Sequence, residues 1–159
     1  MKLIIFSDSH GLLHYMREIV SRSRDCTFLH LGDNVRDMET VMGEYPGSAV
    51  YQVSGNSYED LYSGAQRERV VTVEGVRIFM AHGHRHDVRQ GVSALRDAAA
   101  THAANLVLFG HTHVPYSECF GDVWVVNPGS ISGIRSTVGV TYAEVVIEGG
   151  IVIPRIVGV

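Results

Sequence analysis

The residues of this sequence that could do chemistry are histidines and acids placed directly after short apolar runs. The chain holds nine histidines, and five of them lie in two clusters, at residues 82–86 and 111–113. Before the second cluster, the apolar run 106–109 leads into a glycine and then into His111 and His113. A buried strand can deliver two metal ligands at its end in this way, although two histidines in a turn are more often solvated or satisfied by structural contacts than bound to a metal.

Carboxylate and amide side chains occupy comparable positions earlier in the chain. Asp8 with His10, then Asp33, then Asn56 each follow an apolar run that ends in glycine or serine. Each acid also has an ordinary interpretation, since Asp8 would suit a helix cap and Gly32-Asp33-Asn34 is a common turn sequence. Individually these motifs are weak, so their value depends on whether the fold brings them together.

The spacing of apolar residues predicts the elements that would position these side chains. We expect strands at residues 2–6, 26–31, 49–53 and 106–109, helices at 12–22 and 88–102, a partly helical stretch at 35–43, an irregular loop at 57–66, and hairpins at 69–80, 116–126 and 141–157. Strands alternate with helices first and hairpins follow. This order favours an α/β fold, a layered αββα sandwich of two mixed sheets with flanking helices.

In such a fold, the residues at the ends of the strands can meet at one edge of the domain. The seven candidates are Asp8, His10, Asp33, Asn56, His82, His111 and His113. Mixed nitrogen and oxygen ligands of this kind suit two neighbouring divalent cations, and one carboxylate must then bridge them. We choose Asp33 as the bridge. Two such cations, two carboxylates and a hydroxide leave one positive charge, which matches a phosphodiester.

Composition limits the remaining possibilities. The 159 residues, 45% of them hydrophobic, fit a single domain over residues 1–159. A net charge of −4 makes binding to long nucleic acid unexpected, and no apolar run is long enough for a membrane helix, so we expect a cytoplasmic protein. Cys26 and Cys119 lie in apolar, strand-like segments, where buried and chemically inert side chains are expected.

Taken together, the motifs resemble those of the calcineurin-like metallophosphoesterase superfamily, and the chain length resembles its small YfcE-type phosphodiesterases. The motifs that carry this resemblance are Asp8-x-His10, Gly32-Asp33, Gly55-Asn56, His82-Gly83-His84 and Gly110-His111-Thr112-His113. The resemblance extends from Asp8 to the turn at residues 127–130. It implies a hydrolase in which a hydroxide between two metal ions attacks phosphorus in line, without a covalent intermediate.

The resemblance also implies how the ligands divide between the two ions. One ion would be held by Asp8, His10, Asp33 and His113, and the other by Asp33, Asn56, His82 and His111. Asn56 is thus expected to act both as a metal ligand and in catalysis. Mn²⁺ is our first choice of metal, with Ni²⁺, Zn²⁺ and Fe as alternatives.

The sequence departs from the family pattern after Asn56. Many members carry a histidine there that protonates the leaving alcohol, and YfcE-type members often read Gly-Asn-Cys-Asp, whereas this chain has Ser57 and Tyr58. Serine is no comparable acid at neutral pH. His84, two residues after a proposed ligand, is the candidate for binding the phosphate or for protonation, although a structural role is an equal alternative.

Two other functions are compatible with the same fold. A phosphomonoesterase would need the same metal ligands as a diesterase. A non-catalytic scaffold is known within this fold, in the retromer complex, but its metal site is impaired, whereas all seven positions here carry competent side chains. By analogy with small family members, we expect a homodimer or homotetramer that acts on a small phosphoester.

Overall fold

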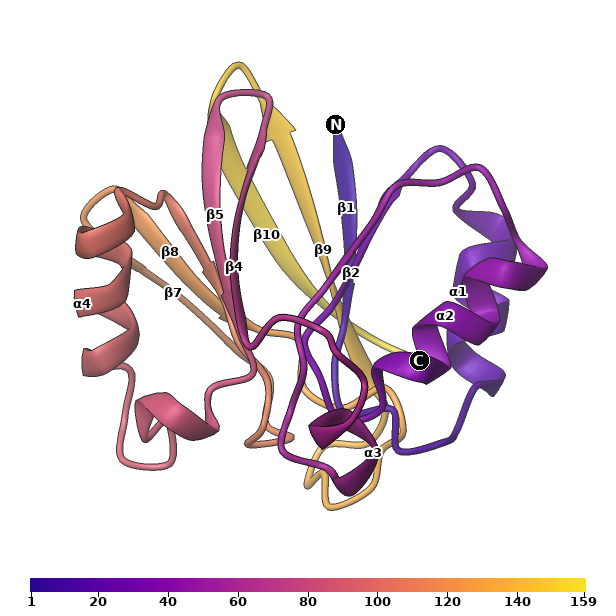
Figure 1. Ribbon diagram of the computed structural model, residues 1–159. Helices are drawn as coiled ribbons and strands as arrows, with labels where there is room; N and C mark the ends of the chain where they lie inside the picture. The colour runs from indigo at the N-terminus through magenta and orange to yellow at the C-terminus, as the bar shows by residue number, and fades with distance from the viewer.

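The computed structural model describes residues 1–159, and its strands form two five-stranded sheets (Figure 1). The first sheet, in the order β10-β9-β1-β2-β3, contains β1 (Lys2–Phe6), β2 (Thr27–His30), β3 (Val50–Gln52), β9 (Thr141–Glu148) and β10 (Ile151–Gly158). The second, in the order β4-β5-β6-β8-β7, contains β4 (Glu68–Val73), β5 (Val76–Ala81), β6 (Leu106–Leu108), β7 (Tyr116–Phe120) and β8 (Val123–Asn127). Both sheets are mixed, as predicted.

Helices cover the outer faces of the two sheets. They are α1 (His14–Arg22), α2 (Val35–Glu44) and α4 (Ser93–His102), whereas the short helix α3 (Tyr58–Leu61) and a 3-10 helix, η1 (His84–His86), lie in the loops after β3 and β5. In Figure 1, α1 and α2 lie beyond the first sheet and α4 lies beyond the second. The predicted αββα sandwich is therefore confirmed, and none of its helices is long and apolar enough to cross a membrane.

The core consists of three apolar layers that follow from the alternation of side chains along each strand. On β1, Leu3 and Ile5 join the layer between the sheets, while Ile4 and Phe6 face α1 and α2. On β5, Phe79 faces α4. Each such buried side chain contributes about 1.5 to 3 kcal/mol of hydrophobic stabilisation. Burial on both faces explains why these strands are continuous apolar runs.

Parallel pairing brings the carboxyl ends of several strands to one edge of the sandwich. In the first sheet, β1 pairs in parallel with β2 and β2 with β3; in the second, β5 pairs with β6 and β6 with β8. The loops that carry the candidate residues all leave from these ends. They meet at the bottom of Figure 1, next to α3.

Three predictions about local structure were wrong. The expected loop at 57–66 contains α3, because Ser57 accepts a hydrogen bond from the Asp60 amide and so begins a helical turn. The helix expected from residue 88 begins only at Ser93, since Asp87 and Gly91 have positive φ angles of 49° and 131°. Similarly, the first helix begins at His14 rather than at residue 12.

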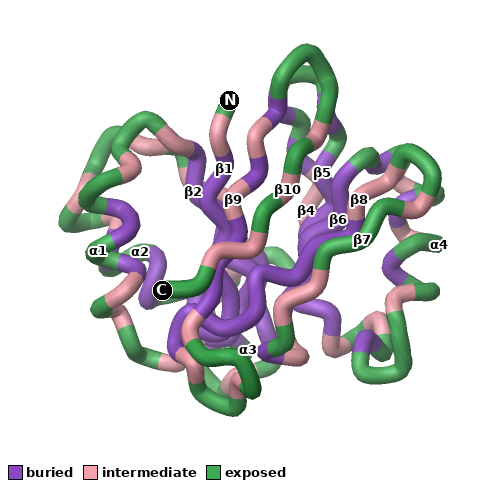
Figure 2. The backbone as a smooth tube through the Cα atoms, turned by 180° about the vertical axis from the view of Figure 1, so that it is seen from behind, coloured by how far each residue is buried: buried purple, intermediate pink, exposed green.

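The outer edges of the sheets are the most exposed strands. Figure 2 shows β7 and β10 largely in the colours of exposed and intermediate residues, whereas β1 and β2 are mostly buried. Cys119 lies on β7 and is exposed, so the expectation that it is buried was wrong; Cys26 is partly buried. The expectation failed because β7 is an edge strand, which a local apolar pattern does not reveal.

Candidate metal centre

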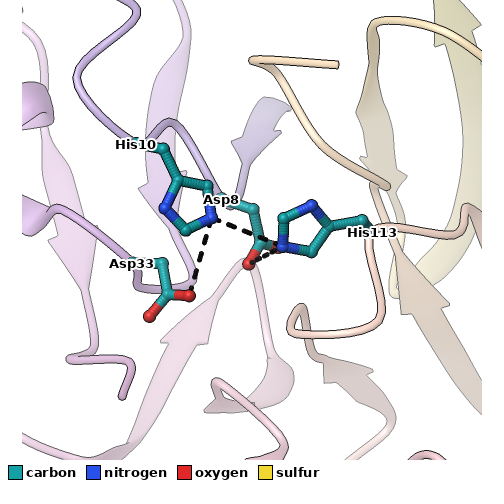
Figure 3. A group of neighbouring side chains, drawn as sticks. All are labelled: Asp8, His10, Asp33 and His113. Carbon is teal, nitrogen blue, oxygen red and sulfur yellow. Dashed lines mark hydrogen bonds and ion pairs between the residues drawn. The ribbon is translucent and has the colours of Figure 1, made fainter. Parts of the chain in front are cut away.

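Four of the predicted ligands form one compact cluster. Asp8, His10, Asp33 and His113 each offer a nitrogen or oxygen atom, and these atoms lie within 4.8 Å of one another. Figure 3 shows the four side chains pointing toward a common centre from loops of both sheets. Two carboxylates and two imidazoles at such separations are the ligand set of a divalent transition metal. We call this cluster the first half of the centre.

The contacts inside the first half are close and mutual. His113 Nε2 lies 3.2 Å from Asp8 Oδ1, and His10 Nε2 lies 3.4 Å from His113 Nε2. His10 Nε2 is also 3.7 Å from Asp33 Oδ2. Nitrogen and oxygen lone pairs crowded in this way need a cation or protons between them.

The remaining ligands lie on the other side of Asp33, in a group that we call the second half. His82 Nε2 is 3.5 Å from Asp33 Oδ1, so the two oxygens of Asp33 face His10 and His82 respectively. His111 Nδ1 lies 3.1 Å from Asn56 Oδ1, and the rings of His82 and His111 are 5.2 Å apart. Asp33 thus lies between the two halves.

Buried polar atoms without partners indicate that the centre suits metal ions. Asp8 Oδ1 and His82 Nε2 are both buried and make no hydrogen bond, although each is only 3.9 Å from the other. An unpaired buried carboxylate oxygen and imidazole nitrogen are costly unless a cation binds them. These two atoms therefore fit the divalent metal ions that the sequence motifs imply.

Two histidines are held in the tautomer that a metal requires. The Nδ1–H of His82 donates to the carbonyl of Leu31 at 2.7 Å, and the Nδ1–H of His113 donates to the carbonyl of Ile134. Because a neutral imidazole carries one proton, each Nε2 is then free to act as a ligand.

The charges of the first half stabilise each other. Although burial would raise the pKa of the Asp8 carboxyl, the ion pair with His113 and the nearby His82 hold it below its usual value. The same ion pair with Asp8 raises the pKa of His113. Burial, followed by the nearby His82 and Arg89, lowers the pKa of His111 to about 4. At neutral pH His111 is therefore unprotonated, which is the state that a metal ligand requires.

Five of the seven proposed ligands have a left-handed backbone. The φ angles are 56° at Asp8, 47° at His10, 58° at Asp33, 70° at His111 and 59° at His113. Residues other than glycine avoid this region at a cost of about 1 to 2 kcal/mol each. Such strain persists only where the surrounding structure enforces it, so these loops are held by contacts outside the ligands themselves.

The glycine before a ligand allows the loops to approach closely. A Cβ atom at Gly55 would lie 2.3 Å from Asp33 Oδ1, and one at Gly110 would lie 1.9 Å from Ser7 Oγ. Both distances are far shorter than any real contact. The Gly-Asn and Gly-His pairs of the motifs therefore follow from packing between the loops.

Asp60 on α3 joins the loops of the two halves and was missed in the sequence. Its carboxylate is buried and accepts four backbone N–H groups, from Asp33 at 2.8 Å, Asn34 at 3.0 Å, Val35 at 2.9 Å and Gly55 at 2.6 Å. The donors are Asp33 itself, the two residues after it, which include the first residue of α2, and the residue before Asn56. Asp60 is therefore a positioning residue for the proposed ligands.

Hydroxyl groups after β8 hold the backbone of Asp8. Ser130 and Ser132 donate to the Asp8 carbonyl at 3.0 Å and 2.8 Å. Asn127 donates to the Gly110 carbonyl at 2.9 Å, in the turn before His111. The turn at residues 127–130 thus supports the strained ligand loops.

A second buried network supports the loop after β1. His30 Nε2 lies 3.1 Å from Ser9 Oγ, and Ser9 donates to Asp37 Oδ2 at 2.7 Å. The Gly11 amide donates to the same Asp37 oxygen at 2.7 Å. This network joins β2, α2 and the loop of His10, and it places His30 outside the metal centre.

The centre opens into a polar cavity of about 270 Å³ without hydrophobic lining. Five proposed ligands line it, together with Ser57, Arg89 and Arg135. His84 does not line it, although its ring lies 5.5 Å from the ring of His82 and 6.1 Å from that of His111. The two arginines were not identified from the sequence, since isolated arginines outside a motif carry no local signal.

All seven predicted ligands thus lie together where five strands end, and the division of these residues between two ions remains a prediction. The family model for the calcineurin-like phosphoesterase superfamily domain matches residues 1–150. The chain therefore belongs to the calcineurin-like phosphoesterase superfamily, a class of hydrolases that use divalent metals.

Individual relatives agree with this assignment. The chain is 30% identical to the probable metallophosphoesterase YsnB of Bacillus subtilis, over 93% of this chain and 85% of that protein. It is 26% identical to the phosphodiesterase MJ0936 of Methanocaldococcus jannaschii, over 93% and 100%. A crystal structure of a predicted phosphoesterase from Streptococcus pneumoniae superposes with a TM-score of 0.82 at 29% identity, over 98% of this chain and 87% of that one.

Proposed function

We propose that this protein is a phosphodiesterase that hydrolyses small phosphodiesters at a centre of two divalent metal ions. The observation that carries the proposal is the position of Asp33, whose two carboxylate oxygens face His10 at 3.7 Å and His82 at 3.5 Å. A carboxylate between two ligand groups is what a pair of ions needs to reduce their mutual repulsion. The name of the archaeal relative supports the choice of a diester.

The chain itself would supply binding, orientation and charge balance. The two ions, when bound, would supply a hydroxide nucleophile and neutralise charge on the phosphoryl oxygens. Asp8 and Asp33 bring two negative charges to the four positive charges of the ions, and the nucleophile brings a third. One positive charge remains to attract a phosphodiester monoanion, which explains how a chain of net charge −4 would bind an anion.

The leaving group would depart without a strong acid from this chain. Ser57 lies where many family members have a histidine that protonates the leaving alcohol. Its hydroxyl accepts a hydrogen bond from the Asp60 amide at 3.3 Å. Burial lowers the pKa of His84, so its ring is neutral at pH 7 and would donate as a neutral N–H group. We assign His84 to the substrate phosphate rather than to protonation. Esters with good leaving groups would then be the better substrates.

The test compares bis(p-nitrophenyl) phosphate with p-nitrophenyl phosphate. The protein is first treated with a chelator, and Mn²⁺, Ni²⁺, Zn²⁺ or Fe²⁺ is then added back, with Asp33→Ala as the inactive reference. Turnover that returns with metal and favours the diester is expected. We expect Mn²⁺ to restore the most activity. The other metals are included because ligand sets with carboxylates and imidazoles accept several metals, and availability selects among them.

Each alternative function gives a different result in this assay. Preference for the monoester would make the protein a phosphomonoesterase with the same metal centre. Binding of two ions without turnover of either ester would contradict an enzymatic role and favour the scaffold.

A further inference from the structure

The cavity over the metal centre has a local charge opposite to that of the whole chain. Among the residues that line it, Asp33 is the only acid, whereas Arg89 and Arg135 are permanent cations. The protein as a whole carries a net charge of −4. Since the chain as a whole is acidic, two arginines in a small polar cavity indicate binding of an anion.

The two arginines lie beside different histidines of the centre. Arg89, in the segment before α4, donates from Nε to His111 Nε2 at 3.2 Å. Arg135 follows Ile134, whose carbonyl accepts the Nδ1–H of His113, and it has a left-handed φ of 56°. The two guanidinium groups therefore come from separate segments, one next to each ligand of the Gly-His-x-His motif.

The reacting phosphate alone does not account for both arginines. With two divalent ions, Asp8, Asp33 and a hydroxide, the proposed centre already matches the single charge of a diester. Arg89 and Arg135 add two positive charges at the mouth of the cavity. The cavity, at about 270 Å³, has no hydrophobic lining and so suits a second phosphate better than an apolar substituent.

We propose that Arg89 and Arg135 bind a second phosphate on the substrate, so that the enzyme selects phosphodiesters that also carry a terminal phosphate. This inference rests on the proposed phosphodiesterase function. Arginine is suited to the role because its planar guanidinium donates two parallel hydrogen bonds to phosphate oxygens.

The test uses two diesters that differ by one phosphate. They are thymidine 5′-(p-nitrophenyl phosphate) and the same compound with a 3′-phosphate. In the metal-loaded enzyme, the 3′-phosphorylated diester should have a kcat/KM at least about tenfold higher, mainly through a lower KM. Arg89→Gln and Arg135→Gln should each reduce this ratio several-fold, and the double variant should bring it close to one.

Arg24→Gln is the matched control, because Arg24 is exposed in the turn before β2, at the opposite ends of the strands. It should leave the ratio unchanged. A ratio near one in the wild-type enzyme, or a ratio that both cavity variants leave intact, would overturn the proposal.

A binding measurement separates this proposal from the proposed function. Calorimetry on the metal-loaded protein compares thymidine 3′,5′-bisphosphate with thymidine 5′-phosphate, and tighter binding of the bisphosphate, lost in the double variant, is expected. If neither diester is hydrolysed but p-nitrophenyl phosphate is, the diesterase function fails, and this binding difference still decides the role of the arginines. Equal binding of the two nucleotides would exclude it.

Discussion

The two halves of the proposed metal centre differ in how completely the fold holds their ligands. In the first half, Asp8, Asp33 and His113 are buried, and all four donor atoms lie within 4.8 Å of one another. In the second half, Asn56 is exposed and His111 is half-buried, with Nε2 engaged by Arg89. In the second half, only Asp33 and His82 are buried and so held in place by the surrounding structure.

This difference has a thermodynamic consequence. Ligands that are already fixed lose little conformational entropy when an ion binds, whereas exposed ligands must first be ordered. We therefore expect the first half to bind its ion more tightly than the second. The buried half would retain an ion under conditions that empty the exposed half.

The largest effect is expected from Asp33, which belongs to both halves. Replacing Asp33 by alanine removes the shared ligand, so neither ion should remain bound, and turnover of bis(p-nitrophenyl) phosphate should fall by about 10³-fold or more. Metal content by mass spectrometry and initial rates provide the measurement. Asp25→Ala, which removes an exposed acid in the turn after α1, is the control. A variant with most of its rate would show that Asp33 is not the bridge.

Two histidine variants compare the halves directly. His113→Gln should remove the tightly bound ion together with the weaker one, because the second ion then lacks its partner. His111→Gln should leave one ion per chain and lower only the affinity for the second, by about 10- to 100-fold. Titration of the chelated protein with Mn²⁺ gives both constants. If the two variants lost the same number of ions, the halves would be equivalent.

A variant of Asp60 tests whether its hydrogen bonds position the proposed ligands. In Asp60→Asn, the new NH2 group would replace one carboxylate oxygen and face two backbone N–H donors from which it cannot accept a hydrogen bond. This should cost about 1 to 3 kcal/mol of unfolding free energy. The affinity for the second ion should also fall, by about 10- to 100-fold, because Gly55 precedes Asn56.

Glu59→Gln, an exposed change on the same helix, is the matched control for denaturant unfolding and Mn²⁺ titration. Lost stability with unchanged Mn²⁺ affinity would limit Asp60 to a role in folding.

A smaller effect is expected from pH. His113 has a raised pKa because it forms an ion pair with Asp8, so below that pKa it is protonated and must lose a proton to bind a metal. Affinity for the first ion should rise with pH up to that pKa, by about tenfold per pH unit, and then level off. His111, with a pKa of about 4, should add no such dependence above about pH 5.

Calorimetric Mn²⁺ binding between about pH 6 and pH 8 provides the measurement. Affinity for the first ion that does not change over this range would contradict the assignment of His113 as its ligand.

The sequence was most informative where a polar candidate ligand directly follows an apolar run typical of a buried strand. Buried strands such as β1 are continuous apolar runs, so their ends and the ligands that follow, such as Asp8, were recognisable. Asp60 was missed because an acid in a polar stretch has no periodic pattern. The spacing of Ser57 and Asp60 matches a helix N-terminus and could have revealed α3. Arg135 was missed because only the folded chain places it beside His113.

The four hydrogen bonds to Asp60 have a consequence for motion. Because one carboxylate accepts the amides of Asp33, Asn34, Val35 and Gly55, a movement of Asp60 away from them breaks all four hydrogen bonds at once. The start of α2 and the loop of Asn56 should therefore open as one cooperative unit, with similar hydrogen-exchange rates for the four amides. Motion of the Asn56 loop, in the second half of the centre, would in this way also move Asp33, the ligand that both halves share.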